Sequence, residues 1–141
     1  MEETVHVPSG YIGRRFLAAI IDYSIQWIIL IVLVQNFGVP TEKENTFQLP
    51  GAIGLLPIAF WLLLIIGMEQ VTGATIGDGI MGLKPLSLSG GKPTVAQSLK
   101  RHLLDVADMF FFGIVAYVNI KNTKYKQRLG DVWAKTIVIR G

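Results

Sequence analysis

The sequence contains no cysteine and few charged residues, and both shortages restrict what the protein can be. Without cysteine there is no disulfide, no thiol nucleophile and no thiolate metal site, so redox chemistry says nothing about the compartment. Only 16% of the residues are charged, whereas 51% are hydrophobic. The hydrophobic residues are concentrated in long runs, which is typical of a membrane protein. At 141 residues the chain is expected to form one domain.

Motifs for nucleotide, metal or hydrolytic chemistry are also missing. The glycine-rich segment 70–93 lacks the Gly-Lys-Ser/Thr ending of a phosphate-binding loop. His6 and His102 have no partners at metal-ligand spacing. Ser98, His102 and Asp105 resemble a hydrolase triad in residue type, but one helix face does not easily converge them on a substrate. We therefore predict that the protein is not an enzyme and uses no cofactor or metal.

Three apolar runs are candidates for entering a membrane. The first, residues 16–34, contains one charge, Asp22, and the second, residues 51–68, contains none. A helix of roughly 20 residues crosses a hydrocarbon core of about 30 Å, so both are predicted transmembrane helices. The third lies within residues 103–120. Its apolar part, residues 109–118, makes only about 15 Å of helix, which predicts a half-inserted or re-entrant segment.

The distribution of lysine and arginine predicts the orientation. Residues 1–15 contain two basic residues, the 35–50 loop one, residues 69–102 four and the 121–141 tail six. Basic segments tend to stay in the cytoplasm. Two full crossings with a half-inserted third segment therefore place the N- and C-termini in the cytoplasm, and the plasma membrane is the expected location. Because the basic residues flank apolar runs, the expected partner is the lipid bilayer and not nucleic acid.

Two short segments have the pattern of β-strands, Leu83–Ser89 and Thr136–Arg140. Isolated strands are unstable in water, so we expect these two to pair on one side of the membrane. The predicted fold class is an all-α membrane protein with two full transmembrane helices, a third half-inserted or re-entrant helical segment, and a short cytoplasmic β-hairpin-like pairing.

Charged residues beside the apolar runs are the candidate functional residues. Asp22 lies about two turns inside the first span, where an ionised carboxylate needs a protein or water partner. We expect it to pair across helices with Arg101 or Arg128, and Asp108 to pair with Arg15 or Arg128. Such pairs either take part in transport or only fix the register of the helices. The candidate functional or structural ion pairs involve Arg15, Asp22, Arg101, Asp108, Arg128 and Asp131.

Arg128 and Asp131 flank Gly130 in the tail. One interpretation is that the arginine binds lipid phosphate. The other, which we favour, is an internal Arg–Asp clasp across the tight turn at Gly130.

These charged residues belong to three motifs in a fixed order. They are Arg15…Ala18…Asp22, then Gly73-Ala-Thr75-Ile-Gly77 with Gly82-Leu-Lys84 and Gly90-Gly-Lys-Pro93…Arg101…Asp108, and finally Gln127-Arg128-Leu-Gly130-Asp131…Ala134-Lys-Thr136-Ile-Val138. In this order they resemble the RDD family of small membrane proteins, named for one arginine and two aspartates. The resemblance divides the chain into a polar lead-in, residues 1–13, and an RDD-like membrane domain, residues 14–141. One departure is Asp78-Gly79, where the family usually carries a basic residue after Thr-x-Gly.

The resemblance implies a transport-related function, ion- or proton-coupled, through the buried arginine and aspartate groups. Two or three spans are few for a pathway, so a transporter of this size is expected to form oligomers. The alternative is a membrane binding or assembly module that holds a partner membrane protein or a lipid, with the Arg/Asp pairs purely structural. Gly51, Gly54 and the face of Trp61 would then form the docking surface.

Overall fold

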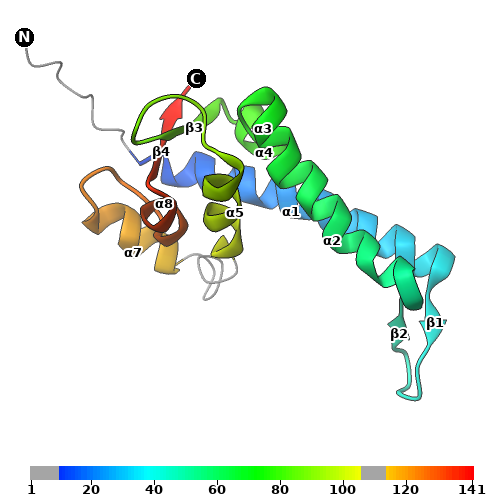
Figure 1. The fold of residues 1–141 in the computed structure, drawn as a ribbon. Coiled ribbons are helices and arrows are strands. Elements are labelled where there is room, and N and C mark those ends of the chain that lie inside the picture. The colour runs from blue at the N-terminus through cyan, green and yellow to red at the C-terminus, as the bar shows by residue number, and fades with distance from the viewer. Residues whose placement is uncertain (1–9, 106–113) are drawn as a thin grey trace, which may run out of the picture.

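The computed structural model describes residues 10–105 and 114–141, and two long helical segments lying side by side dominate it (Figure 1). The first is α1, Ile12–Phe37. The second runs from Gly51 to Thr72 and has the length and composition of a membrane span, as α1 does. Most residues of both spans are left exposed by the rest of the chain, as expected for helices whose outer faces contact lipid.

The second span changes its helical pitch along its length. It comprises the 3-10 turn η1 (Gly51–Leu55), α2 (Leu56–Trp61), the π-helical turn η2 (Leu62–Gly67) and α3 (Met68–Thr72). Pro57 lies in the first turn of α2. Its missing N–H costs no helical hydrogen bond there. The π-helical turn adds a residue to one helical turn and so re-aims the residues that follow it, Glu69 among them.

A short ribbon connects the two spans. Strand β1 (Val39–Pro40) pairs antiparallel with β2 (Phe47–Gln48), within the loop expected at residues 35–50. The ribbon lies at the end of the hairpin that holds the C-terminus of α1 (Figure 1).

The remaining elements gather at the opposite end, around the N-terminal half of α1 (Figure 1). They are α4 (Ile76–Ile80), β3 (Leu83–Ser87), α5 (Val95–Leu103), α7 (Ile114–Asn122), α8 (Leu129–Ala134) and β4 (Thr136–Arg140). We call this assembly the cap. Its core includes Ala18 of α1 packed with Leu83 of β3 and Val138 of β4.

Strands β3 and β4 pair antiparallel, with Leu83 opposite Arg140 and Ser87 opposite Thr136. The sequence predicted this pairing, although the first strand ends at Ser87 and not at Ser89. The two strands are far apart along the chain, so the pairing is not a true hairpin. It holds the C-terminal tail against the segment that follows the second span.

Helix α5 begins at Val95 because Thr94 caps it. The Thr94 hydroxyl accepts from the Gln97 amide, and the Gln97 side chain accepts from the Thr94 amide. Residues 106–113 lie outside the described residues. They include Asp108 and part of the third predicted membrane segment, so the half-inserted segment stays a prediction.

Candidate functional site

Charged side chains from both spans and from the cap meet in one buried cluster. We call it the ion cluster, and its members are Arg15, Glu69, Arg101, His102, Asp105, Arg128 and Asp131. Its side chains come from α1, α3, α5 and α8 and from the segments just beside the last two. The cluster therefore joins the spans to the cap.

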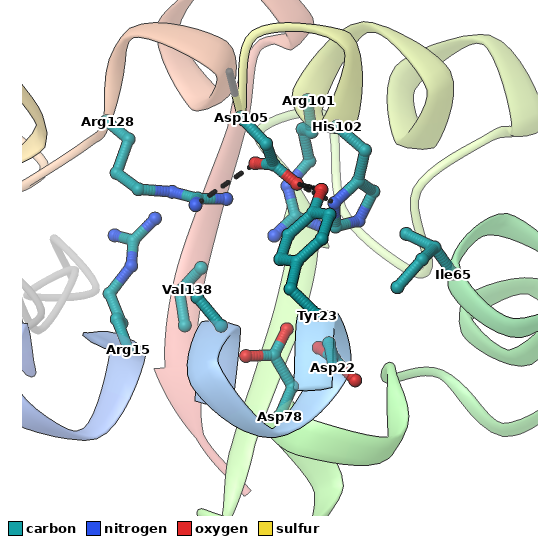
Figure 2. Close-up of a pocket in the computed structure, with 11 residues that line it drawn as sticks. Arg15, Asp22, Tyr23, Ile65, Asp78, Arg101, His102, Asp105, Arg128 and Val138 are labelled. Atoms are coloured by element: carbon teal, nitrogen blue, oxygen red, sulfur yellow. Dashed lines mark hydrogen bonds and ion pairs between the residues drawn. The ribbon is translucent and has the colours of Figure 1, made fainter. Parts of the chain in front are cut away.

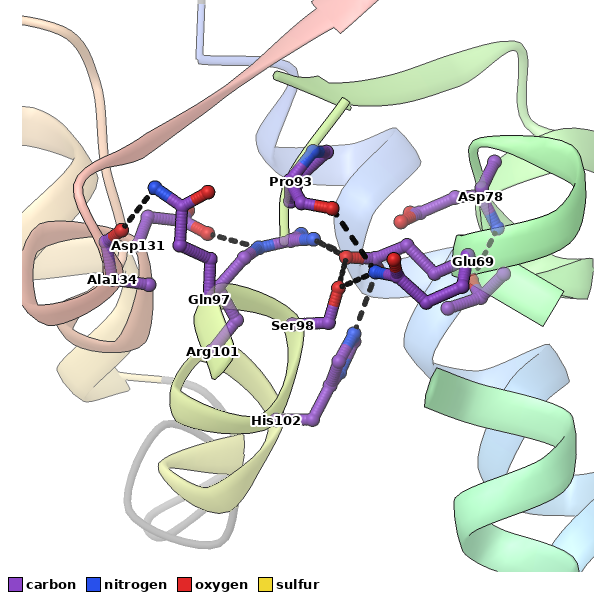
Figure 3. Close-up of polar contacts among 12 residues, drawn as sticks. Glu69, Asp78, Pro93, Gln97, Ser98, Arg101, His102, Asp131 and Ala134 are labelled. Atoms are coloured by element: carbon purple, nitrogen blue, oxygen red, sulfur yellow. Dashed lines mark hydrogen bonds and ion pairs between the residues drawn. The ribbon is translucent and has the colours of Figure 1, made fainter. Parts of the chain in front are cut away.

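Arg101 lies at the centre of the ion cluster and is only 1% exposed. Its Nη1 donates to both carboxylate oxygens of Glu69 at 2.8 Å, and its Nε donates to Asp131 Oδ1 at 2.9 Å (Figure 3). Burial alone would lower the pKa of Arg101, but the charges of these two carboxylates outweigh it and raise the pKa. Arg101 thus stays charged and bridges the end of the second span to α8.

Three arginine side chains surround Asp131. Arg15 Nη2 donates to its Oδ2, Arg101 bonds its Oδ1, and Arg128 Nε lies 3.8 Å from Oδ2. The backbone N–H of Arg128 also donates to Oδ2 at 3.1 Å, which caps the start of α8. Burial would raise the pKa of Asp131, but the three arginines hold it well below its usual range. The ion pair between Arg128 and Asp131 that the sequence favoured is present, but it spans the first turn of α8 and not a separate tight turn at Gly130.

His102 lies between two carboxylates. Its Nδ1 is 3.0 Å from Asp105 Oδ2 and its Nε2 is 2.9 Å from Glu69 Oε2. Burial would lower the pKa of His102, but these carboxylates outweigh it and raise the pKa to about 9. Both ring nitrogens therefore donate, and the imidazolium is the form that fits this position.

Asp105, just past α5, accepts from three residues. Its Oδ2 accepts from the Tyr23 hydroxyl at 2.5 Å and faces His102, and its Oδ1 accepts from Arg128 Nη1 at 3.2 Å (Figure 2). Burial would raise the pKa of Asp105, but His102 and Arg128 lower it to about 2. Asp105 is therefore a permanent anion at neutral pH.

Asp22 is held in a different way. It is 7% exposed, its Oδ2 accepts from the Thr75 hydroxyl at 2.6 Å, and its Oδ1 accepts from the Gly77 N–H at 2.7 Å. The expected pairing of Asp22 with Arg101 or Arg128 is wrong. Helix α4 packs against α1 and supplies two neutral donors, while both arginines bond to other carboxylates.

The Thr75-Ile-Gly77 motif explains how α4 comes so close. Thr75 caps α4, because its Oγ1 accepts from the Asp78 N–H at 3.1 Å while its hydroxyl donates to Asp22. A Cβ at Gly77 would lie 2.1 Å from the Ala18 carbonyl oxygen of α1. Only glycine allows the α4 backbone to approach α1 closely enough for the amide to bond the carboxylate.

A small cavity separates Asp22 from the ion cluster. It has a volume of about 20 Å³, which suffices for one water molecule. Figure 2 shows Asp22 and Asp78 on one side of this region and His102 and Asp105 on the other, with the Tyr23 side chain extending from α1 to Asp105. The cavity is therefore polar, and it connects a carboxylate of the first span with the charged residues of the cap.

The structure brings together most of the residues that the sequence singled out. Arg15, Arg101, Arg128 and Asp131 are in the ion cluster, with Arg15 paired to Asp131. Asp22 lines the neighbouring cavity. Asp108, which the sequence paired with Arg15 or Arg128, lies outside the described residues.

Glu69, His102, Asp105 and Tyr23 were not predicted as site residues. Two signals were available: Glu69 closes an otherwise uncharged span, and Asp105 follows Arg101 by one helical turn. Ser98, part of the apparent triad, donates to Glu69 at 2.6 Å, so Glu69 lies between Ser98 and His102. Within the described ranges 10–105 and 114–141, no group of His, Asp or Glu has the arrangement of a metal site.

Comparison with protein families matches residues 10–135 to a model described as the RDD family. The match covers both spans, the Thr75-Ile-Gly77 motif and the Arg128–Asp131 clasp. Comparison with curated proteins and with solved structures finds no match.

Proposed function

This chain belongs to the RDD family of membrane proteins, and we propose that it is transport-related, with Asp22 exchanging a proton or another monovalent cation. The observation that carries the proposal is the environment of Asp22. It is a carboxylate within a membrane span, it is bonded by a hydroxyl and an amide, and it borders a cavity of water size. A carboxylate placed in this way can bind and release a cation without breaking an ion pair.

The balance of charge around the cavity supports the proposal. Among the described residues 10–105 and 114–141, the ion cluster holds four cationic groups, counting His102, and three carboxylates. Asp22 and Asp78 both line the cavity beside it. Two carboxylates beside one small cavity favour the binding of a proton or a monovalent cation there, because like charges repel each other.

Transport by this chain requires further helices. Two spans that leave most of their residues exposed do not enclose a path. We therefore propose that the transporting unit is an oligomer of this chain, with Asp22 of each copy near the boundary between its spans and cap.

The test is a flux assay in proteoliposomes after a pH jump, with several monovalent cations. The proposal expects cation-dependent proton movement in the wild type and its loss in Asp22→Asn. Glu42→Gln, in the exposed ribbon loop, removes the same kind of charge far from the cavity and should keep full flux. Equal flux in wild type and Asp22→Asn would overturn the role of Asp22.

The orientation is a separate proposal. We place both termini on the cytoplasmic side, because the cap carries most of the basic residues. A single cysteine introduced at Gly141 should react with a membrane-impermeant reagent only after the cells are opened. Reaction in intact cells would contradict this orientation.

A second candidate function rests on a different observation, the saturation of the ion cluster. Each of its carboxylates bonds cationic partners, so the cluster holds the cap on the spans without any cargo. On this interpretation the protein is an assembly module that holds a partner membrane protein. It predicts no flux in the wild type or in Asp22→Asn. It also predicts that a partner co-purifies with the wild type and is lost when Gly54, in the second span, is replaced by a larger residue.

A further inference from the structure

Helices α5 and α8 of the cap carry exposed apolar side chains next to each other. Leu103 of α5 is 52% exposed, and Leu129, Val132 and Trp133 of α8 are 38%, 44% and 49% exposed. Lys100 of α5 lies over the Trp133 ring, with Nζ 5.6 Å from its centroid. Within each helix the exposed residues are three or four positions apart and share a face, and the contact of Lys100 with Trp133 joins the two faces, so these five residues form one surface. We call it the interfacial patch.

We propose that the interfacial patch rests in the headgroup region of the bilayer and binds anionic lipid through Lys100. The first argument is the level of these helices along the spans. Arg15, which bonds α8, lies about 33 Å of helix from the far end of α1 at Phe37. Glu69, which bonds α5, lies about 27 Å from the start of the second span at Gly51.

These two lengths bracket the hydrocarbon thickness of about 30 Å. With the ribbon end of the hairpin at one membrane surface, Arg15 and Glu69 lie at the other. Their bonding partners on α8 and α5 are therefore held at the depth where acyl chains meet headgroups. Apolar side chains exposed at this depth lie beside lipid, which accounts for their exposure.

The second argument is the chemistry of the patch. Tryptophan and tyrosine concentrate at membrane interfaces, and lysine reaches from an apolar surface to the headgroups. Lys100 over Trp133 places both features together. Helix α7 repeats the combination, with Lys121 Nζ 5.5 Å from the Tyr117 ring centroid and Tyr117 half exposed.

Charge complementarity selects the lipid. Residues 114–141 contain six basic residues and a single acidic one, Asp131, which is buried among arginines. The cap therefore presents a surplus of positive charge at the level of the headgroups. Anionic lipid attracts basic groups at this position.

The test uses the absence of native cysteine, which allows one environment-sensitive NBD fluorophore to be attached at a chosen position. Val132→Cys places it on the patch. Leu88→Cys, beyond β3 and also exposed, is the matched control. Each labelled protein is reconstituted in phosphatidylcholine vesicles containing lipids that are spin-labelled near the headgroup or deep in the chain.

The proposal expects the label at position 132 to be quenched more by the shallow spin label than by the deep one, and to resist aqueous iodide. The label at position 88 should be quenched by aqueous iodide. Quenching of position 132 by iodide alone would overturn the proposal. So would quenching by neither agent, which would place a protein surface over the patch.

Lys100→Gln tests the choice of lipid. The fluorophore at position 132 is quenched in turn by spin-labelled phosphatidylglycerol and by spin-labelled phosphatidylcholine. In Lys100→Gln the ratio of the first quenching to the second should fall by up to about fivefold, the effect of one basic group at an anionic surface. Lys43→Gln, in the ribbon loop at the far end of the hairpin, should leave the ratio unchanged. An unchanged ratio in Lys100→Gln would remove anionic lipid from the proposal.

Discussion

Asp131 and Asp22 are both buried carboxylates on helices, yet their surroundings are opposite. Asp131 is fully buried and receives guanidinium groups from Arg15 and Arg101, with a third from Arg128 nearby. Asp22 is almost as buried, but its two oxygens accept from a hydroxyl and a backbone amide. The region around Asp131 fixes negative charge, whereas the region around Asp22 tolerates either charge state.

This difference assigns the Asp131 region to the stability of the fold and leaves Asp22 available for cation exchange. Removing charge from the Asp131 region leaves unpaired ions in a dry interior, which is costly. Neutralising Asp22 leaves no arginine behind among its bonded partners in the described structure. Stability and transport should therefore respond to different residues, and variants can measure how far the two regions are separate.

The largest effect is expected for Arg101→Met. The variant leaves Glu69 and Asp131 buried without their shared cation, so the free energy of unfolding should fall by about 3–5 kcal/mol. Thermal and denaturant unfolding in detergent would measure the loss. Lys43→Met, in the exposed ribbon loop, should change the stability by less than about 0.5 kcal/mol. Equal effects of the two variants would show that Arg101 is not the bridge described above.

The next effect is a loss of stability as the pH rises, caused by His102. Its folded pKa of about 9 exceeds the ordinary value of 6.5, so its contribution is fully present below pH 6.5 and lost as the pH rises through 9. The contribution is on the order of 3 kcal/mol, because Glu69 and Asp105 then face a neutral ring. Asp105, with its pKa lowered to about 2, stays charged throughout this range.

His102→Gln provides the comparison for the pH dependence. Unfolding measured from pH 6 to 10 should show a smaller decline in the variant than in the wild type. If stability declined equally with pH in the wild type and in His102→Gln, a group other than His102 would cause the decline.

A smaller loss of stability is expected for Gly77→Ala, which acts on the Asp22 region. The added Cβ meets the Ala18 carbonyl and the Asp22 carboxyl carbon, 2.9 Å away, so α4 must move off α1. Overpacking of this kind costs about 1–3 kcal/mol. Gly79→Ala, on the same helix, meets nothing within 4 Å and should leave stability unchanged or raise it by about 0.5–1 kcal/mol. The flux of Gly77→Ala should also fall, because the Gly77 amide no longer bonds Asp22.

The sequence was sufficient for the parts of the fold that follow from local pattern. The lengths of the apolar runs predicted both spans, and the two β-strand patterns placed β3 and β4. The Arg128–Asp131 clasp was also predictable, because its two residues are one helical turn apart.

Partners across helices were not predictable from spacing. Asp22 was expected to bond an arginine, but α4 lies so close to α1 that the Thr75 hydroxyl and the Gly77 N–H donate to the Asp22 carboxylate instead. Glu69 enters the ion cluster after a π-helical turn, whose position in the second span was not predicted. Such contacts depend on a few ångströms of helix placement, which a single sequence does not specify.

The smallest effect on stability is expected for Asp22→Asn. The amide oxygen can still accept from Gly77, and the amide nitrogen can donate to the Thr75 oxygen, so the loss should be about 1 kcal/mol or less. Asp131→Asn changes the same atoms but strands the arginines, so its loss should be several times larger. Unfolding of the two variants in the same detergent measures the two losses of stability. Equal losses would make Asp22 a structural anion like Asp131, and a missing flux in Asp22→Asn would then reflect a damaged fold and not a lost cation site.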